Sequence, residues 1–457
     1  MGSLPQNTRA ERTCVPPRFF LTFAVVSSKF PLNTPHFSLR TMRRVFLFLV
    51  PALLSSISFA QDIPLRWSGE VRMRAEADGR DFLSRSPMNL YTLLRARLGV
   101  EARPADNVAA FVQIQDARVF GEERDGTGAF NTISNTKNLD VHQAFIKIEK
   151  FLFNELSVKV GRQELVYGNE RLVGAVGWSN IGRSFDGGLI RWSNPSMTTD
   201  FFLMNTGETN IPPVAAMPAA VKFNRDEGQL FSGIYYSRAI TSNHQADVYL
   251  FHQLNRKRSV PNTDDLSRYT IGSYAKGTMS RFFYEAEVAY QTGKISVTDV
   301  GASMLTGSVG VSLSLSAITS VAVGADLLSG TATGSADSRT FDPPFATGHK
   351  FYGFMDYFIA IPSNTYNGGV RDLYLRCTAK PAESVLLNVW IHDFAFAETQ
   401  FSRKNVGQEI DIIGAWRYAK NLTLEAGITA FIPGEVMQFL YGRDVATWMY
   451  VSAQLVF

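Results

Sequence analysis

Apolar and polar residues alternate one by one along most of the chain from residue 65 onward. The first such stretch has Leu65, Trp67, Val71 and Met73 at apolar positions, with mostly polar residues between them. A period of two is the spacing of a β-strand that has one apolar and one wet face. The same alternation recurs in segments 94–101, 110–115, 156–161, 385–392, 409–417, 422–429 and 449–457. The pattern predicts an all-β fold.

Short turns and long polar loops separate the predicted strands in regular alternation. Short turns are expected at 102–107, 150–154, 194–198, 239–243, 277–280, 316–320, 380–384 and 419–421. Long loops are expected near 77–88, 119–138, 163–184, 206–229, 253–267, 292–303, 329–369, 395–407 and 432–446. Eight turns and nine loops join eighteen strands. Residues 351–358 could form another strand, but an odd count would break the parity, so we assign them to the loop 329–369.

A transmembrane antiparallel β-barrel of 18 strands explains this pattern. Bacterial outer-membrane barrels have an even number of strands, short periplasmic turns, long outer loops and an apolar exterior. A soluble fold would have to cover the apolar face of every strand, and the sequence shows no amphipathic helix that could do so. Phe457 ends the last alternating segment, as is typical of such barrels. We therefore predict a barrel in contact with the lipid of the bacterial outer membrane, and we expect a monomer.

The first sixty residues read as a leader and not as part of the barrel. A basic start at residues 42–44 precedes a short apolar run, and Ser58 and Ala60 occupy the −3 and −1 positions of a cleavage site. This is the pattern of a secretory signal peptide. We divide the chain into 1–41, an upstream over-extension before a true start at Met42, the signal peptide 42–60, and the barrel 61–457.

Removing the leader changes the charge of the protein. Residues 1–60 hold seven of the 45 basic and one of the 41 acidic residues, so 38 basic and 40 acidic side chains remain, a net of about −2. This balance removes the electrostatic basis for binding nucleic acid. Of the two cysteines, only Cys377 remains, so no intramolecular disulfide is expected.

Charged residues at inward positions of the predicted strands are candidates for the path of a solute. The basic candidates are Arg72, Arg74, Arg95, Arg97 and Lys159, and the acidic candidates are Glu409 and Asp411. Rings of charge select ions by sign. The alternative is a solvated lumen whose charges pair with one another, as any wide barrel needs polar groups around its water.

The stretch 161–188 carries further candidates on a long, glycine-rich connection. They are Arg162, Arg171, Trp178, Arg183 and Asp186. Arginine suits carboxylates and tryptophan offers a stacking face for sugars, so this loop could fold inward as a constriction. The alternative is a packed cap whose charges satisfy one another. The same question, gate or cap, applies to the loop 329–369.

No catalytic fingerprint occurs in the chain. The histidines after the leader are His142, His244, His252, His349 and His392, and none has a convincing partner along the sequence. Asp342, His349, Lys350 and Asp356 fit no known metal spacing. We expect no enzyme activity, no cofactor and no metal.

Four blocks of sequence resemble the alginate export family of bacterial outer-membrane barrels. They are GRQELVYGNERLVG (161–174), WSNIGRSFDG (178–187), ATGHKFYGFMDYF (346–358) and GQEID (407–411). The resemblance covers roughly residues 65–457. It implies an eighteen-stranded barrel with an arginine-rich, electropositive lumen, and its namesake secretes the polyanionic polysaccharide alginate.

Two functions from different classes follow. The first is a channel that passes polar or anionic solutes, with export of an anionic polysaccharide such as alginate, fed by a periplasmic secretion partner, as a special case. The second is a structural or partner-binding barrel with an occluded lumen. Conductance in planar bilayers separates them.

Overall fold

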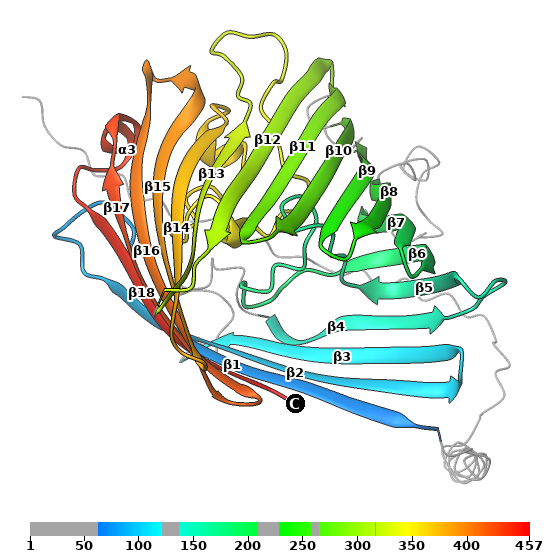
Figure 1. The fold of residues 1–457 in the computed structure, drawn as a ribbon. Helices are drawn as coiled ribbons and strands as arrows, with labels where there is room; N and C mark the ends of the chain where they lie inside the picture. The colour runs from blue at the N-terminus through cyan, green and yellow to red at the C-terminus, as the bar shows by residue number, and fades with distance from the viewer. Residues whose placement is uncertain (1–62, 121–136, 209–227, 257–264, 316) are drawn as a thin grey trace, which may run out of the picture. The chain divides into compact units, whose positions relative to one another are not determined.

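The barrel is a single closed sheet in the computed structural model, which describes residues 63–120, 137–208, 228–256, 265–315 and 317–457. In these ranges eighteen antiparallel strands pair in chain order, and β1 also pairs with β18 (Figure 1). The predicted eighteen-stranded barrel is confirmed. The proposed over-extension and signal peptide lie outside the described residues.

The strands are long, as expected of elements that cross a bilayer at a tilt. In the first half they are β1 (Leu65–Gly79), β2 (Asn89–Ala105), β3 (Val108–Val119), β4 (Lys137–Ile148), β5 (Leu156–Gln163), β6 (Phe185–Asn194), β7 (Met197–Glu208), β8 (Gly228–Thr241) and β9 (His244–Arg256). In the second half they are β10 (Leu266–Met279), β11 (Phe282–Ile295), β12 (Thr298–Ser312), β13 (Ile318–Leu328), β14 (Val370–Ala382), β15 (Val385–Gln400), β16 (Arg403–Ala419), β17 (Leu422–Pro433) and β18 (Ala446–Val456).

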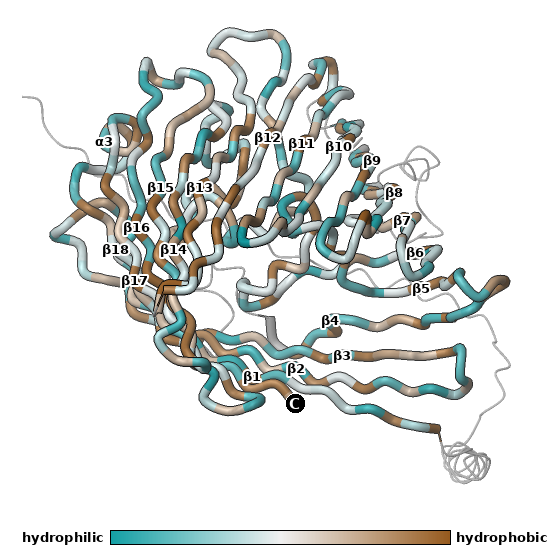
Figure 2. The backbone as a smooth tube through the Cα atoms, in the orientation of Figure 1, coloured by the Kyte–Doolittle hydropathy of each residue, from teal (hydrophilic) through white to brown (hydrophobic). Residues whose placement is uncertain are grey.

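The alternation of the sequence becomes an apolar outside and a polar inside. On β1, Trp67 is 64% and Met73 46% exposed, whereas Arg72 is 6% exposed. Successive side chains of a strand point to opposite faces, so the exposed residues form the outer surface and the buried ones the lumen. Figure 2 shows the matching alternation of hydropathy along the strands. Among the described residues, no helix is long and apolar enough to cross a membrane.

The first and last strands, β1 and β18, close the barrel. The backbone N–H of Gly69 donates to the carbonyl of Phe457 at 2.7 Å, and the reverse bond measures 3.0 Å. The Phe457 ring lies over Gly69, where an added Cβ would come within 2.2 Å of the ring. The terminal aromatic residue thus covers a gap that glycine leaves in the first strand.

The prediction of long loops near 292–303 and 395–407 is wrong. β11 and β12 are joined through residues 296–297 alone, and β15 and β16 through 401–402. Both Phe401 and Ser402 have positive φ, 54° and 61°, which is the geometry of a tight hairpin turn. Their sequence lacks the Asn-Gly or Asp-Gly signal of such turns, and the strands continue through polar residues that resemble a loop. The predicted loops 119–138, 206–229 and 253–267 lie largely outside the described residues.

Two long loops fold into the lumen and pack against each other. They are residues 164–184, between β5 and β6, and residues 329–369, between β13 and β14, here called the inner loops. Val173 and Phe345 form a parallel β-bridge between them, and Gly174 donates to the Phe345 carbonyl at 2.9 Å. Residues 351–358 contain no strand, as predicted.

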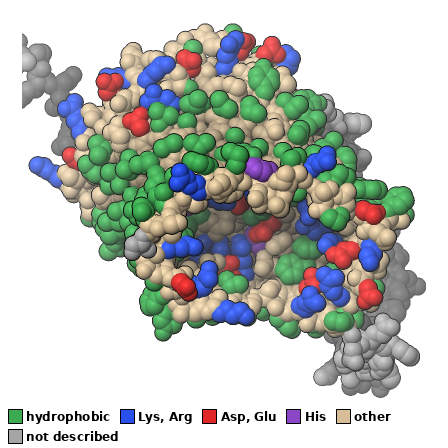
Figure 3. Space-filling view, in the orientation of Figure 1, with side chains coloured by type: hydrophobic (Ala, Val, Ile, Leu, Met, Phe, Trp, Pro, Cys, Tyr) green, Lys and Arg blue, Asp and Glu red, His purple; other side chains and the backbone are tan. Residues whose placement is uncertain are grey.

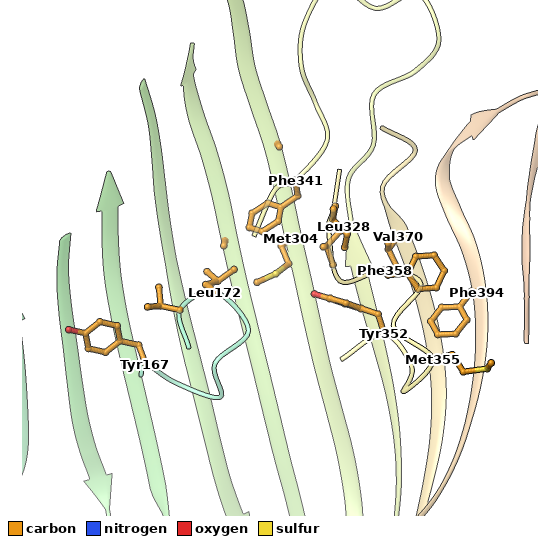
Figure 4. Close-up of a cluster of buried hydrophobic side chains, with 14 of the residues drawn as sticks. Tyr167, Leu172, Met304, Leu328, Phe341, Tyr352, Met355, Phe358, Val370 and Phe394 are labelled. Carbon is orange, nitrogen blue, oxygen red and sulfur yellow. The ribbon is translucent and has the colours of Figure 1, made fainter. Parts of the chain in front are cut away.

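The inner loops carry an apolar core of their own. Tyr167, Leu172 and Phe341 are buried with Tyr352 and Phe358, and they pack against lumen-facing residues of the wall such as Met304, Leu328, Val370 and Phe394 (Figure 4). Lumen residues of a wide barrel are ordinarily polar. Here the lumen-facing aromatic side chains are covered by loops, which explains why they sit at inward positions. The described part of the chain also has short helices. They are η4 (Gly348–Lys350) and η5 (Ser363–Thr365) in the second inner loop and α3 (Glu435–Leu440) between β17 and β18.

Candidate functional site: a capped lumen with two charged walls

Four arginines form a continuous basic patch on the lumen face of β1 and β2. This arginine wall consists of Arg72 and Arg74 on β1 and Arg95 and Arg97 on β2. Arg72 and Arg95 are direct neighbours across the two strands. Like charges at opposed positions of a sheet repel each other. Glu70, which binds Arg95 at 2.6 Å, and Glu76, which binds Arg74 at 2.6 Å, offset only part of this charge.

Backbone carbonyl groups of the first inner loop supply most of the remaining acceptors, and Gln115 on β3 accepts a 2.7 Å bond from Arg97. Arg72 donates to the carbonyls of Gly177, Trp178 and Ser179 at 2.8, 2.9 and 3.0 Å. Arg95 donates to Gly177 and Ser179 at 2.9 and 2.8 Å. We call residues 177–181 the cap segment. Because a charged donor forms stronger hydrogen bonds than a neutral one, the arginine wall holds the cap segment in the lumen.

The other two members of the arginine wall also bind the cap segment. Arg74 donates to the Trp178 carbonyl at 2.8 Å, and Arg97 donates to the Ile181 carbonyl at 3.1 Å. All four arginines that the sequence singled out are therefore brought together, and each of them contacts the cap segment. Their role in a solute path stays a prediction.

Trp178 lies between two charged or polar planes. The Arg74 guanidinium carbon is 3.8 Å from the centre of its ring, and the His349 ring stacks on it at 4.1 Å with 6° between planes. His349 in turn binds Asp356 at 2.7 Å. The ring proposed as a stacking face for sugars thus has protein groups on both faces in this structure.

One histidine binds both ends of the first inner loop. His142 on β4 contacts Glu164, the first residue of the loop, at 2.8 Å, and its carbonyl accepts a 2.6 Å bond from the Ser184 hydroxyl at the loop's end. Burial acts to raise the pKa of Glu164, but the hydrogen bond and charge of His142 and the charges of Arg97 and Arg95 outweigh it and lower that pKa. The loop is therefore held at its ends as well as at the cap segment.

Arg171 anchors the same loop to the opposite side of the lumen. Its guanidinium binds Asp326 on β13 at 2.7 Å and lies 4.0 Å from the centre of the Phe351 ring. Burial acts to lower the pKa of Arg171, but the charges of Asp326 and Glu287 contribute to raising it well above its usual value. Arg171 is 4% exposed, so this ion pair is closed to water.

Arg183 joins the two inner loops. It donates to the carbonyls of Phe345 and Ala346, the latter at 3.0 Å. Burial lowers the pKa of Arg183 to about 10. Arg171 and Arg183, proposed from sequence as constriction residues, thus act in this structure as contacts that fix the loop.

The candidates Lys159, Arg162 and Asp186 lie apart from the arginine wall. Arg162 on β5 pairs with Asp186 on β6 at 2.7 Å, and both side chains are partly exposed. Lys159 lies 4.8 Å from the centre of the Phe145 ring. β5 and β6 are separated from β2 by β3 and β4, so the structure does not bring these three residues to the cap segment.

A second charged patch covers the lumen face of β13 to β16. This histidine–carboxylate wall consists of Asp326, Asp372, His392, Glu409 and Asp411. His392 binds Asp372 at 2.9 Å and lies 3.7 Å from an oxygen of Asp411. Glu409 accepts a 2.8 Å bond from the backbone N–H of Met355 in the second inner loop. Its members are at most 3% exposed.

Sequence reasoning missed the partners of three histidines. His142, His349 and His392 each bind a carboxylate, and in each pair the partner is far away in the sequence or on a loop whose path the sequence does not reveal. The only available signal was the inward position of His142 and His392 on their strands. No group of three His, Cys, Asp or Glu side chains in the described part of the chain is arranged to hold a metal.

A cavity of about 820 Å³ lies beside the capped region. Its walls include Asn169, Arg171 and His349 of the inner loops and strand residues such as Asp372 and Arg376. It reaches the short turn between β8 and β9. Figure 3 shows the molecule hollowed on this side, with basic and acidic side chains gathered inside and hydrophobic ones on the strands around.

Comparison with known structures gives the class of protein first. The Acinetobacter baumannii protein OccAB4 matches over 86% of this chain and 98% of its own, with a TM-score of 0.55 and 11% identity. Pseudomonas aeruginosa OccK3 (OpdO) matches over 86% and 95%, with a TM-score of 0.57 and 11% identity. Pseudomonas aeruginosa OccK8 (OprE) matches over 86% and 98%, with a TM-score of 0.56 and 11% identity. The fold is thus that of the outer-membrane β-barrel porins.

The sequence then assigns the chain to a family. Residues 63–447 match the family described as Alginate export, and the chain belongs to this family. The predicted resemblance is confirmed, and with the fold it supports an outer-membrane channel. No curated protein matches the chain.

Proposed function

We propose that this protein is an outer-membrane channel for polar and anionic solutes, gated by the first inner loop. One observation carries the proposal: the four guanidinium groups of the arginine wall hold the cap segment through neutral backbone carbonyls. A carboxylate is a stronger acceptor for arginine than a carbonyl and fits its fork in two places. An anionic solute can therefore compete for the arginines and release the cap.

The anchors of the loop support a gate with a fixed hinge. Arg171 holds the loop through an ion pair and His142 through a hydrogen bond, both away from the cap segment, and Arg183 binds it to the second inner loop. The cap segment lies between these anchors, so it can leave the arginine wall without unfolding the whole loop once the bonds from Asn180 to the carbonyls of Leu94 and Arg118 are also broken. The channel then opens beside β1 and β2.

Conductance and ion selectivity in planar bilayers test the proposal. We expect the wild-type protein to prefer anions, and the pair of changes Arg72→Gln and Arg95→Gln to reduce that preference. Arg103→Gln is the control, because Arg103 lies on β2 but pairs with Glu101 away from the cap segment. A cation preference that the double change leaves unaltered would contradict the proposal.

Export of an anionic polysaccharide such as alginate, fed by a periplasmic partner, is a second candidate. The family match favours it. Liposomes that contain the protein and are loaded with an alginate oligomer would release it in a manner that depends on Arg72 and Arg95. Retention of the oligomer beside normal passage of small anions would exclude this candidate.

A structural or partner-binding barrel with an occluded lumen is the alternative, favoured by the tightly bound cap segment. It predicts no conductance even after the arginine wall is changed. We further propose that the protein is a monomer, has no enzyme activity and is exported with Gln61 as its first residue. Sedimentation in detergent, an esterase screen and N-terminal sequencing check these three points.

A further inference from the structure

Two buried carboxylates on the lumen face of β16, Glu409 and Asp411, have too few hydrogen-bond donors. They lie in the block GQEID (407–411), and both residues are 0% exposed. The Oε1 atom of Glu409 accepts the 2.8 Å bond from the backbone N–H of Met355, but its Oε2 atom and both oxygens of Asp411 have no donor in the part of the chain that the structure describes. Buried polar groups of folded proteins are nearly always hydrogen-bonded. The pair therefore needs a donor that two ionised carboxylates do not provide.

A single proton supplies that donor. Residues two apart on a strand point to the same face, and the carboxyl groups of Glu409 and Asp411 lie within hydrogen-bonding reach of each other. Two carboxylates this close in a dry site repel each other strongly if both are ionised, so one of them keeps its proton. With the proton on its Oε2 atom, Glu409 donates to Asp411 while its Oε1 atom still accepts from Met355.

The histidine beside the pair does not replace this proton. The titratable groups around the pair are Asp372, His392, His349, Asp356, Tyr357 and Arg80. His392 is bound to Asp372 at 2.9 Å and lies 3.7 Å from Asp411. One imidazole thus faces three carboxyl groups, those of Asp372, Glu409 and Asp411, and a charge on it leaves an excess of negative charge.

The cations on the other side of the pair are bound to a different carboxylate. His349 binds Asp356 at 2.7 Å, and Arg80 lies 3.9 Å from Asp356. On β17 the residues opposite the pair are Phe431 and Thr429, which carry no charge. Among the described residues, no cation therefore offsets an ionised Glu409.

The backbone of the second inner loop closes directly over Glu409. Gly353 has a φ of 84°, and a Cβ atom added to it would lie 2.5 Å from the Oε2 atom of Glu409. An ionised carboxylate under this backbone would be cut off from water, which costs free energy. His349 of the same loop stacks on Trp178, so a displacement of the loop also affects the cap segment.

We propose that Glu409 and Asp411 share one proton, and that this proton holds the second inner loop in the lumen. As the pH rises, the O–H bond of Glu409 breaks and the proton passes to the solvent, which leaves two negative charges side by side. The loop then moves away from β16 and admits water to the pair. The inference goes beyond the proposed function, because it adds control by pH to the inner loops and needs no solute.

Infrared spectroscopy of the full barrel in lipid vesicles tests for the proton. We expect the absorption of a protonated carboxylic acid at pH 6, and Glu409→Gln should remove the contribution of one group from this band. Glu425→Gln is the matched control, because Glu425 is a carboxylate on neighbouring β17 that has a donor, the Tyr450 hydroxyl at 2.7 Å. The control should leave the band unchanged.

Hydrogen exchange of the backbone of residues 352–356 tests what the proton holds. When the pH is raised from 6 to 10, exchange relative to an unfolded peptide at the same pH should increase, by up to tenfold per pH unit, because one proton is released. Glu409→Gln should keep exchange slow throughout, since its amide accepts from Met355 and donates to Asp411.

A second variant keeps the test decisive if Glu409→Gln does not fold. Asp411→Asn provides an amide donor to Glu409, so it should also remove the acid band and flatten the pH profile. An acid band that neither variant changes, or one pH profile for all three proteins, would overturn the inference. A loop that is held only when calcium or potassium ions are added would assign a cation to the pair and would overturn it too.

Bilayer recordings separate the shared proton from the channel. We expect a severalfold larger conductance at pH 10 than at pH 6 in the wild-type protein and no such increase in Glu409→Gln. Conductance that is equal at both pH values would overturn the inference and leave the proposed channel intact. A barrel that never conducts, but whose exchange depends on Glu409, would support the shared proton and contradict the channel.

Discussion

The arginine wall and the histidine–carboxylate wall hold the inner loops by opposite means. On β1 and β2, charged side chains of the strands bind neutral carbonyls of the cap segment. On β13 to β16, carboxylates of the strands bind an arginine of the first inner loop and a backbone N–H of the second. A neutral acceptor can be replaced by an anion, whereas a buried ion pair is costly to break. The first wall is therefore suited to a gate and the second to an anchor.

The largest expected effect comes from breaking the anchor. Asp326→Asn removes the carboxylate that binds the buried Arg171 guanidinium and leaves Glu287, 3.9 Å away, as its counter-charge. Breaking a buried pair of this kind costs about 3–5 kcal/mol. We expect the loss in the free energy of unfolding, measured by urea titration of the barrel in lipid vesicles.

Two variants control this measurement. Asp299→Asn removes a carboxylate from an exposed pair with Lys294 on neighbouring β11 and β12, and it should change stability little. Adding Arg171→Met to Asp326→Asn should recover part of the loss, because the buried guanidinium is then gone and Glu287 keeps its hydrogen bond from the Tyr249 hydroxyl. Equal losses at Asp299 and Asp326 would remove the distinction between the walls.

Releasing the cap should have the next largest effect. Arg72→Ala with Arg95→Ala removes five of the hydrogen bonds to the cap segment, whose carbonyls can then accept hydrogen bonds from water. We expect a severalfold higher single-channel conductance or open probability with little change in the urea midpoint. Arg103→Ala should alter neither. A large loss of stability without a change in conductance would make the arginine wall an anchor too.

A smaller, pH-dependent effect is expected at the end of the loop. Because the pKa of Glu164 is lowered in the folded protein, its contribution to stability is fully present above the pKa of an unfolded glutamate, about 4.3. The contribution is lost as the pH falls through the lower, folded pKa. Cap opening should therefore increase as the pH is lowered from 6 to 3. Glu164→Gln should remove part of that increase. An identical pH profile in the variant would exclude this role.

The smallest effect is expected at the exposed pair of Arg162 and Asp186. Screening by water and salt leaves such pairs worth about 0–1 kcal/mol. Arg162→Gln should change the free energy of unfolding by less than about 1 kcal/mol and leave conductance unaltered. A marked change in selectivity would instead place Arg162 on the solute path and add it to the arginine wall.

The loops show which parts of the fold the sequence can predict and which it cannot. Alternation of side chains is a local property, so it identified the strands and the outward positions such as Trp67 and Met73. Polar composition, however, does not separate a loop from a strand that continues beyond the membrane, and the hairpin at Phe401 and Ser402 was missed for that reason. The inner loops were identified, but whether they fill the lumen depends on contacts between distant segments, such as Val173 with Phe345.

The sequence by itself determined the period, the number of strands and the family, because each of these is written in neighbouring residues or in short blocks. It also placed four arginines on one face of two adjacent strands. Only the tertiary structure decided what those arginines bind and that Arg171 reaches Asp326 across 155 positions. The physical reason is that burial and the choice of hydrogen-bond partner depend on how the closed sheet and its inner loops fill the lumen, and no local pattern records that.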